Sequence, residues 1–174
     1  MPSLPPIALA EVNRLDLTSF VALFGDVAEH SPWVAERAAH RRPFADRDAM
    51  IGAFSDAVAR APRADQLELI RAHPDLAGRA AIAGALTDDS KREQAGAGLD
   101  SLTPEEFARF SDFNSLYKKQ NGFPFIFAVK GATKQQILAA FDERVRNDHA
   151  TEFATALGQV CRIFRFRIED RVKP

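Results

Sequence analysis

Apolar residues recur at spacings of three and four along most of the chain, which places them on one face of an α-helix. Residues that cap helix N-termini precede several of these stretches, and some are followed by Pro or Glu in the first turn. We expect caps at Thr18, Ser31, Asp46, Asp65, Thr103 and Thr133. The pattern predicts successive helices, among them 46–59, 65–72 ending near His73-Pro74, and a long amphipathic helix at the C-terminus.

Residues 123–129, Phe-Pro-Phe-Ile-Phe-Ala-Val, break this pattern because they are apolar throughout. Such a run is typical of a buried extended segment, but the chain has no second strand-like run to pair with it. No repeat and no shift in composition marks a linker. We therefore predict an all-α fold: a single-domain helical bundle over residues 1–174 with one buried extended connector, residues 123–129, called the connector from here on.

Charge and hydropathy exclude two classes of partner. The 174 residues include 23 Lys and Arg against 24 Asp and Glu, a formal charge of -1. Because nucleic-acid-binding domains carry basic surfaces, we expect no nucleic-acid partner. No apolar run approaches the length of a membrane-spanning helix, so we expect no membrane partner either.

The lone cysteine, Cys161, cannot form an internal disulfide, which favours a reducing compartment. The N-terminus lacks the basic start and apolar stretch of a signal peptide, and the C-terminus is not the Ser-Lys-Leu peroxisomal signal. We therefore expect a bacterial cytoplasmic protein. Cys161 also lies beside the apolar stripe of the last helix, where we expect a core or near-core role.

The four histidines show no zinc-ligand spacing, and no glycine-rich nucleotide-binding loop follows a strand. We expect no metal and no nucleotide cofactor. Among the histidines, His73 stands out because Pro74 fixes the backbone beside it, so that its ring projects from a rigid corner. The alternative is a histidine that only closes the last turn of its helix.

Ser90, Glu93 and Gln94 lie at i, i+3 and i+4, so a helix beginning near Ser90 presents a hydroxyl, a carboxylate and an amide on one face. Such a cluster suits a small molecule rich in hydrogen-bonding groups, although Ser-x-x-Glu is also a capping box. Near the C-terminus, the arginines are expected to form a solvated face paired with acidic neighbours, unless one of them points inward.

Several ordered motifs carry a family resemblance. They are His73-Pro74-Asp75-Leu76-Ala77-Gly78-Arg79, Ser90-x-x-Glu93-Gln94-x-x-x-Gly98-Leu99, Asn114-x-x-Tyr117 and Gly122-Phe123-Pro124-Phe125-Ile126. Together they resemble the 2-oxo-4-hydroxy-4-carboxy-5-ureidoimidazoline (OHCU) decarboxylase family of urate degradation, from about Phe20 to Ile168. The resemblance implies an all-α homodimer without metal or organic cofactor. It also implies decarboxylation of OHCU, a small molecule, to (S)-allantoin, with a functional link to hydroxyisourate hydrolase.

Carried over by position, the resemblance implies three catalytic residues: His73 as the acid, together with Glu93 and Arg167. Arg167 matches the family arginine better than Arg165 does. The implied substrate-binding residues are Pro74, Ser90, Lys91, Arg92, Gln94, Phe125, Ile126, Phe127, Ala128 and Val129. At Gln120-Asn121-Gly122 the sequence departs from the aromatic residue that the family has before Gly-Phe-Pro.

Two other functions compete with this interpretation. One is a non-catalytic, all-α ligand-binding module, and the other is an acid/base lyase that acts on a related heterocycle. A helix-turn-helix DNA-binding protein is disfavoured by the overall charge.

Overall fold

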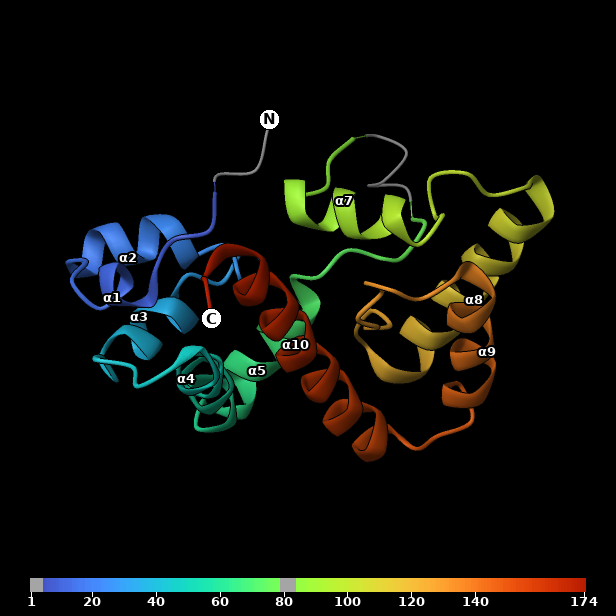
Figure 1. The fold of residues 1–174 in the computed structure, drawn as a ribbon. Helices are drawn as coiled ribbons and strands as arrows, with labels where there is room; N and C mark the ends of the chain where they lie inside the picture. Colours follow the sequence, from blue (N-terminus) through green and yellow to red (C-terminus); the bar gives the residue numbers. More distant parts are fainter. Residues whose placement is uncertain (1–4, 79–83) are drawn as a thin grey trace. The chain divides into compact units, whose positions relative to one another are not determined.

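The computed structural model describes residues 5–78 and 84–174, and its regular structure is helical (Figure 1). The helices are α1 (Leu9–Val12), α2 (Leu17–Phe24), α3 (Trp33–Ala39), α4 (Arg47–Ala59), α5 (Arg63–Arg71), α7 (Asp88–Gly96), α8 (Pro104–Asn121), α9 (Lys134–Arg144) and α10 (His149–Arg171). An isolated parallel bridge joins Ile7 and Val172, and the described ranges contain no named strand. The all-α prediction is confirmed. None of the described helices is both long and apolar enough to span a membrane.

Contacts divide the chain into two compact units. The first comprises Met1–Leu69 and Cys161–Pro174, and the second comprises Ile70–Val160. Helices α5 and α10 each contribute residues to both units. A single domain over the whole chain stays a prediction.

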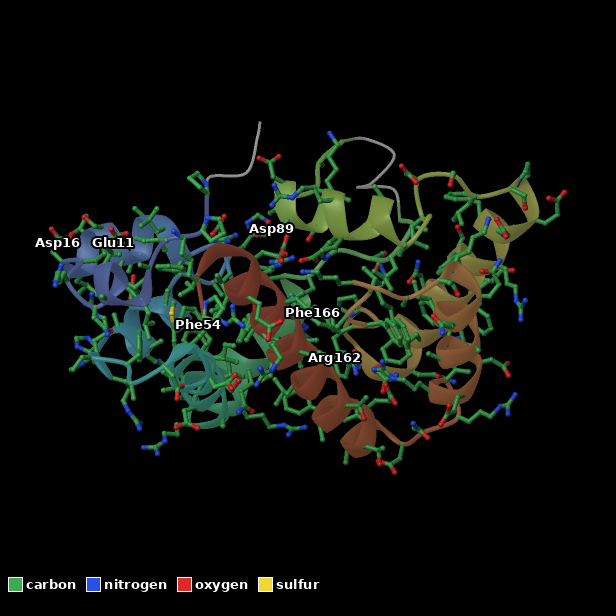
Figure 2. The ribbon with its side chains drawn as sticks, viewed as in Figure 1. Glu11, Asp16, Phe54, Asp89, Arg162 and Phe166 are labelled. Atoms are coloured by element: carbon green, nitrogen blue, oxygen red, sulfur yellow. The ribbon has the colours of Figure 1, made fainter. Side chains whose placement is uncertain are left out.

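Phenylalanine rings form the core of the first unit. Phe20 on α2 contacts the rings of Phe24, Phe44 and Phe54 at centroid distances of 5.0, 6.3 and 6.3 Å. Phe54 on α4, labelled in Figure 2, meets Phe164 on α10 edge to face at 6.1 Å. Because each of these rings is almost fully removed from water, their burial contributes much of the hydrophobic stabilisation of this unit.

The second unit is built around the connector. Phe125 stacks on Phe141 of α9 with centroids 3.7 Å apart, and Tyr117 of α8 packs edge to face against Phe125 at 5.3 Å. The connector lies outside the helices, has no strand pairing and is buried except at Phe127, which is half-buried. The prediction of a buried, non-helical connector is confirmed, and its extended conformation stays a prediction. Asn121, where the family pattern departs, is buried and donates to the Tyr117 carbonyl at 3.2 Å.

Three of the predicted caps are confirmed. The Asp46 carboxylate accepts from the Ala49 N–H at 2.7 Å. Thr103 and Thr133 each form a complete capping box, with Glu106 and Gln136 respectively. The cap, the Pro at the first turn and the acidic third position were all visible in the sequence around Thr103.

The other three predicted caps are wrong. Helix α2 is capped by Asp16, labelled in Figure 2, whose carboxylate accepts from the Ser19 N–H at 2.7 Å. Thr18 therefore lies inside the helix. Ser31 donates its hydroxyl to the Glu29 carbonyl, and Pro32 occupies the N-cap of α3 without a side-chain bond. Asp65 lies within α5, which begins directly after a proline.

Candidate functional site

His73 stands two residues beyond the end of α5, in the second unit. Its N–H donates to the Ile70 carbonyl at 3.2 Å, which continues the last turn of the helix, and only 7% of the residue is exposed. Pro74 follows at a half-buried position. The backbone of His73 thus continues the last turn of α5, and because any residue can make this bond, it does not decide between the two interpretations of the His73 ring. Its burial also allows a role at a site from which bulk water is largely excluded.

The loop after His73 is held by side chains of α7 and α8. Ala77 adopts a left-handed conformation with φ of 52°, which a residue with a Cβ adopts only where its surroundings enforce it. Gln94 accepts from the Ala77 N–H at 3.0 Å and donates to the Asp75 carbonyl at 3.4 Å. Asn114 donates to the Leu76 carbonyl at 2.9 Å. The oxygen and the nitrogen of the Gln94 side-chain amide therefore both form hydrogen bonds with the protein backbone.

Helix α7 begins earlier than the sequence indicated. Thr87 caps it by accepting from the Ser90 N–H at 3.3 Å, and the first helical residue is Asp88. Ser90 therefore is not an N-cap, and the interpretation of Ser90 and Glu93 as a capping box is wrong. Helix capping therefore does not explain the presence of Glu93.

The predicted α7 residues differ in exposure. Ser90 and Gln94 are each 5% exposed and lie one turn apart, whereas Glu93 is half-buried. Lys91 and Arg92 are exposed, and Arg92 pairs with Asp89 on the same helix. The buried face of α7 therefore contains Ser90 and Gln94, while the two cations face water.

Some backbone groups of the connector form hydrogen bonds within the protein, and others have no partner among the described residues. The Ala128 N–H donates to Gln159 of α10 at 2.9 Å, so it is already occupied. The Ile126 carbonyl accepts from Arg144 at 2.7 Å. Within the described residues, no acceptor contacts the N–H groups of Phe125, Ile126, Phe127 or Val129. These N–H groups are the donors that the connector can offer to a bound molecule.

Behind the connector lies a buried charged cluster that the sequence analysis missed. Arg144 donates to Glu152 at 2.8 and 3.0 Å, and the Tyr117 hydroxyl also donates to Glu152. Burial acts to raise the pKa of the Glu152 carboxyl, but hydrogen bonds from Arg144, Tyr117 and Asn147 outweigh it and hold that pKa below its usual range. Burial and the bond to Glu152 raise the pKa of Tyr117. The signal in the sequence was Glu152, a charged residue on the apolar stripe of the last helix.

Arg167 lies in the first unit and points inward. Only 3% of its side chain is exposed, and it pairs with Glu29, itself 1% exposed, at 2.9 Å. Arg165 is exposed and pairs with Asp48 at 2.8 Å and Glu169 at 3.3 Å. The prediction of a solvated, paired face therefore applies to Arg165, while Arg167 is the inward arginine.

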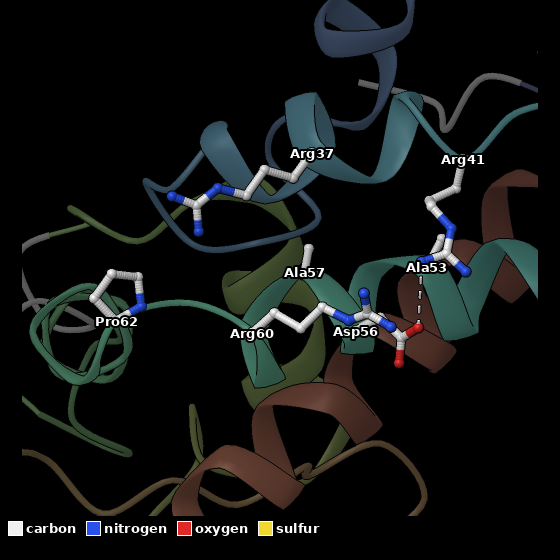
Figure 3. Close-up of a pocket in the computed structure, with 7 residues that line it drawn as sticks. All are labelled: Arg37, Arg41, Ala53, Asp56, Ala57, Arg60 and Pro62. Carbon is white, nitrogen blue, oxygen red and sulfur yellow. Dashed lines mark ion pairs between the residues drawn. The ribbon is translucent and has the colours of Figure 1, made fainter.

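Cys161 is half-buried, and burial raises the pKa of its thiol, which agrees with the near-core role expected for it. Among the described residues, no group of three or more His, Cys, Asp or Glu side chains is arranged to hold a metal ion. The first unit also has a surface pocket of about 330 Å³ (Figure 3). Its lining residues are Arg37, Arg41, Ala53, Asp56, Ala57, Arg60 and Pro62, none of which is a predicted site residue.

Comparison with known proteins links the chain to one family. A family model described as OHCU decarboxylase matches residues 13–169. A 2-oxo-4-hydroxy-4-carboxy-5-ureidoimidazoline decarboxylase from Haloferax volcanii is 46% identical over 165 residues, which are 95% of this chain and 96% of that protein. The uric acid degradation bifunctional protein PucL of Bacillus subtilis is 40% identical over 160 residues, which are 92% of this chain and 32% of that protein.

A solved structure described as an (S)-allantoin synthase superposes on this chain with a TM-score of 0.78 at 30% sequence identity. The match covers 97% of this chain and 54% of the other, so this chain spans about half the length of that protein. The similarity extends over both units of the chain.

Proposed function

The chain belongs to the OHCU decarboxylase family, and from that premise we propose that it is a carboxy-lyase that converts OHCU to (S)-allantoin in urate degradation. The observation that carries this proposal is the match of nearly the whole chain to the Haloferax volcanii decarboxylase, with 46% of the residues identical. The His73-Pro74-Asp75 and Ser90-x-x-Glu93-Gln94 motifs lie within the matched region.

The reaction needs a place for the electron pair that remains when CO₂ leaves. In OHCU the carboxylate is attached to a ring carbon beside a conjugated imine system, which accepts the pair as an enolate-like anion. One proton is then added to the ring carbon that bears the ureido group, which balances charge and atoms and sets the stereocentre. The protein therefore has to orient the substrate, stabilise the anion and deliver that proton to one face.

We assign His73 as the acid that supplies the proton, with Glu93 binding the ureido and ring nitrogens. Both residues belong to the second unit, where His73 is buried and Glu93 is half-buried. The connector N–H groups stabilise the anion. We keep Arg167 as the arginine that binds substrate oxygens, and the support is its place in the family motif together with its inward orientation.

The substrate is unstable, so the test generates it in situ from urate with urate oxidase and hydroxyisourate hydrolase. Circular dichroism then follows the formation of optically active allantoin after this protein is added. We expect a faster rise of the (S)-allantoin signal than in its absence. If OHCU decays at the spontaneous rate and the product is racemic, the proposal is contradicted and the ligand-binding module becomes the better interpretation.

The Glu93→Gln substitution should lower kcat/KM by at least about tenfold, or roughly 1.4 kcal/mol of barrier. The carboxylate is replaced by a neutral amide, and the melting temperature should stay close to wild type because Thr87, not Ser90, caps α7. Coupled-assay kinetics measure the first effect and thermal unfolding the second. As a control, Glu105→Gln on the exposed first turn of α8 should keep full activity. Wild-type kcat/KM in Glu93→Gln would remove Glu93 from the site.

Matched substitutions test whether Arg167 or Arg165 is the arginine that binds the substrate. Arg167→Lys keeps a positive charge beside the buried Glu29 but loses the planar fork, and we expect kcat/KM to fall by at least about tenfold. Arg165→Lys should stay within about twofold of wild type, since Arg165 is exposed and engaged in surface ion pairs. Both variants are assayed by circular dichroism as above. A larger loss in Arg165→Lys than in Arg167→Lys would reverse the assignment.

We further propose a homodimer that works in the cytoplasm without metal or organic cofactor, close to a hydroxyisourate hydrolase that supplies its substrate. Family resemblance supports the dimer and the absence of a cofactor, and the lone Cys161 supports the compartment. The bifunctional uric acid degradation relative, in which the matched region is 32% of the length, supports a link to a neighbouring activity. Sedimentation analysis and metal analysis of the active protein test the dimer and the cofactor.

A further inference from the structure

The buried cluster of Arg144, Glu152 and Tyr117 has no part in the chemistry proposed above. The side chains of Arg144 and Glu152 are 9% and 0% exposed, and Asn147 donates to the second carboxylate oxygen at 2.9 Å. A buried ion pair of this kind contributes little net stability, because desolvation offsets most of the attraction. What it does provide is a guanidinium held in one orientation, and that orientation determines a contact with the connector.

Arg144 uses its third guanidinium nitrogen, Nη1, on the connector. Its Nη1 donates to the Ile126 carbonyl at 2.7 Å, and its guanidinium lies over the Phe125 ring at 4.2 Å. In a trans peptide the carbonyl and the next N–H point in opposite directions. Holding the Ile126 carbonyl toward Arg144 therefore turns the Phe127 N–H away from it. A charge-assisted bond to the carbonyl also polarises that peptide, which makes its N–H a stronger donor.

The next peptide is held from α10. The Ala128 N–H donates to Gln159 at 2.9 Å, which fixes the peptide that contains the Phe127 carbonyl. The two peptides on either side of the Phe127 Cα are thus each held by a side chain from a helix. No acceptor among the described residues contacts the Phe127 N–H. It is an oriented, polarised donor.

We propose that Arg144 and Gln159 are positioning residues that aim the Phe127 N–H at the negative charge that develops on the substrate ring as CO₂ leaves. This inference rests on the proposed function and deepens it by assigning the anion-stabilising donor to one peptide. Neither side chain touches the substrate. Each acts through the connector, and Glu152 and Tyr117 act one step further back by fixing Arg144.

The test compares two substitutions at Gln159. Gln159→Leu removes the acceptor of the Ala128 N–H, whereas Gln159→Glu keeps an acceptor oxygen at the same place. We expect Gln159→Leu to lower kcat by at least about tenfold with KM within about threefold, because the lost interaction operates only in the transition state. Gln159→Glu should restore most of kcat. Gln135→Leu, the same change at an exposed position of α9, is the matched control and should behave as wild type.

Arg144→Lys tests the other contact. Lysine keeps a positive charge for Glu152, but one ammonium cannot serve both that carboxylate and the Ile126 carbonyl, so kcat should again fall with KM little changed. Circular dichroism verifies that each variant is folded. Wild-type kcat in folded Gln159→Leu and Arg144→Lys, parallel changes in kcat and KM, or equal losses in Gln159→Leu and Gln159→Glu would each overturn the inference. An inactive wild-type protein would instead overturn the proposed function, and this inference with it.

Discussion

The His73→Asn variant should lose nearly all catalysed formation of (S)-allantoin, with kcat lower by roughly a hundred- to ten-thousandfold. Asparagine fills a similar volume and keeps a polar side chain, but it has no proton to deliver at neutral pH. Because His73 is only 7% exposed, bulk water does not easily take its place as the proton donor. The measurement is the initial rate of the circular dichroism signal, with the substrate generated in situ.

The control for this substitution is His40→Asn at the exposed C-cap of α3, which should retain wild-type turnover. The melting temperature of His73→Asn should lie within a few degrees of wild type, since its backbone bond to Ile70 is kept. Retention of near wild-type kcat would show that the proton comes from elsewhere. Such a result would leave His73 with only the role of ending α5.

The largest loss of stability is expected from Glu152→Ala, at about 3–5 kcal/mol in the free energy of unfolding. The substitution leaves the Arg144 guanidinium buried without its carboxylate and removes the acceptor of the Tyr117 hydroxyl. Urea unfolding followed by circular dichroism measures the change. Glu143→Ala, an exposed position on α9 beside Arg144, is the control and should change stability by less than about 0.5 kcal/mol. Equal effects of the two substitutions would show that the cluster is not a structural element.

The stability that this cluster contributes depends on pH. Because the folded pKa of Glu152 lies below its unfolded value, its contribution is present above the usual carboxyl range and is lost as pH falls through the folded pKa. The melting temperature should therefore fall in acid, and Glu152→Gln should show a shallower decrease because that carboxyl no longer titrates.

Local signals in the sequence were sufficient for much of the fold. At Thr103 the cap, the proline and the glutamate all favour the same helix start, and the structure has it there. At α2 we predicted Thr18 as the cap, but the carboxylate of Asp16, two residues earlier, forms the capping bond. Capping residues compete over short distances, so the choice depends on backbone geometry that side-chain identity alone does not reveal.

The candidate site was harder to predict. The motifs identified His73 and Gln94, but the sequence does not indicate whether an amide faces a ligand or its own chain. In the structure Gln94 contacts the backbone at Asp75 and Ala77. Arg144 and Glu152 were missed for a related reason. Their importance comes from packing behind the connector, and sequence spacing does not reveal contacts between α9 and α10.

The connector also bears on how the sequence can diverge. A donor supplied by the main chain is present whatever side chain stands at position 127, proline excepted, because proline alone has no N–H. If the connector binds the substrate as we propose, a change of the half-buried Phe127 side chain would alter the shape of the site while the N–H donor stays in place. The constraint moves to Arg144 and Gln159, which hold that backbone from other helices. On this proposal, the position that sets substrate range would be separate from the positions that orient the donor.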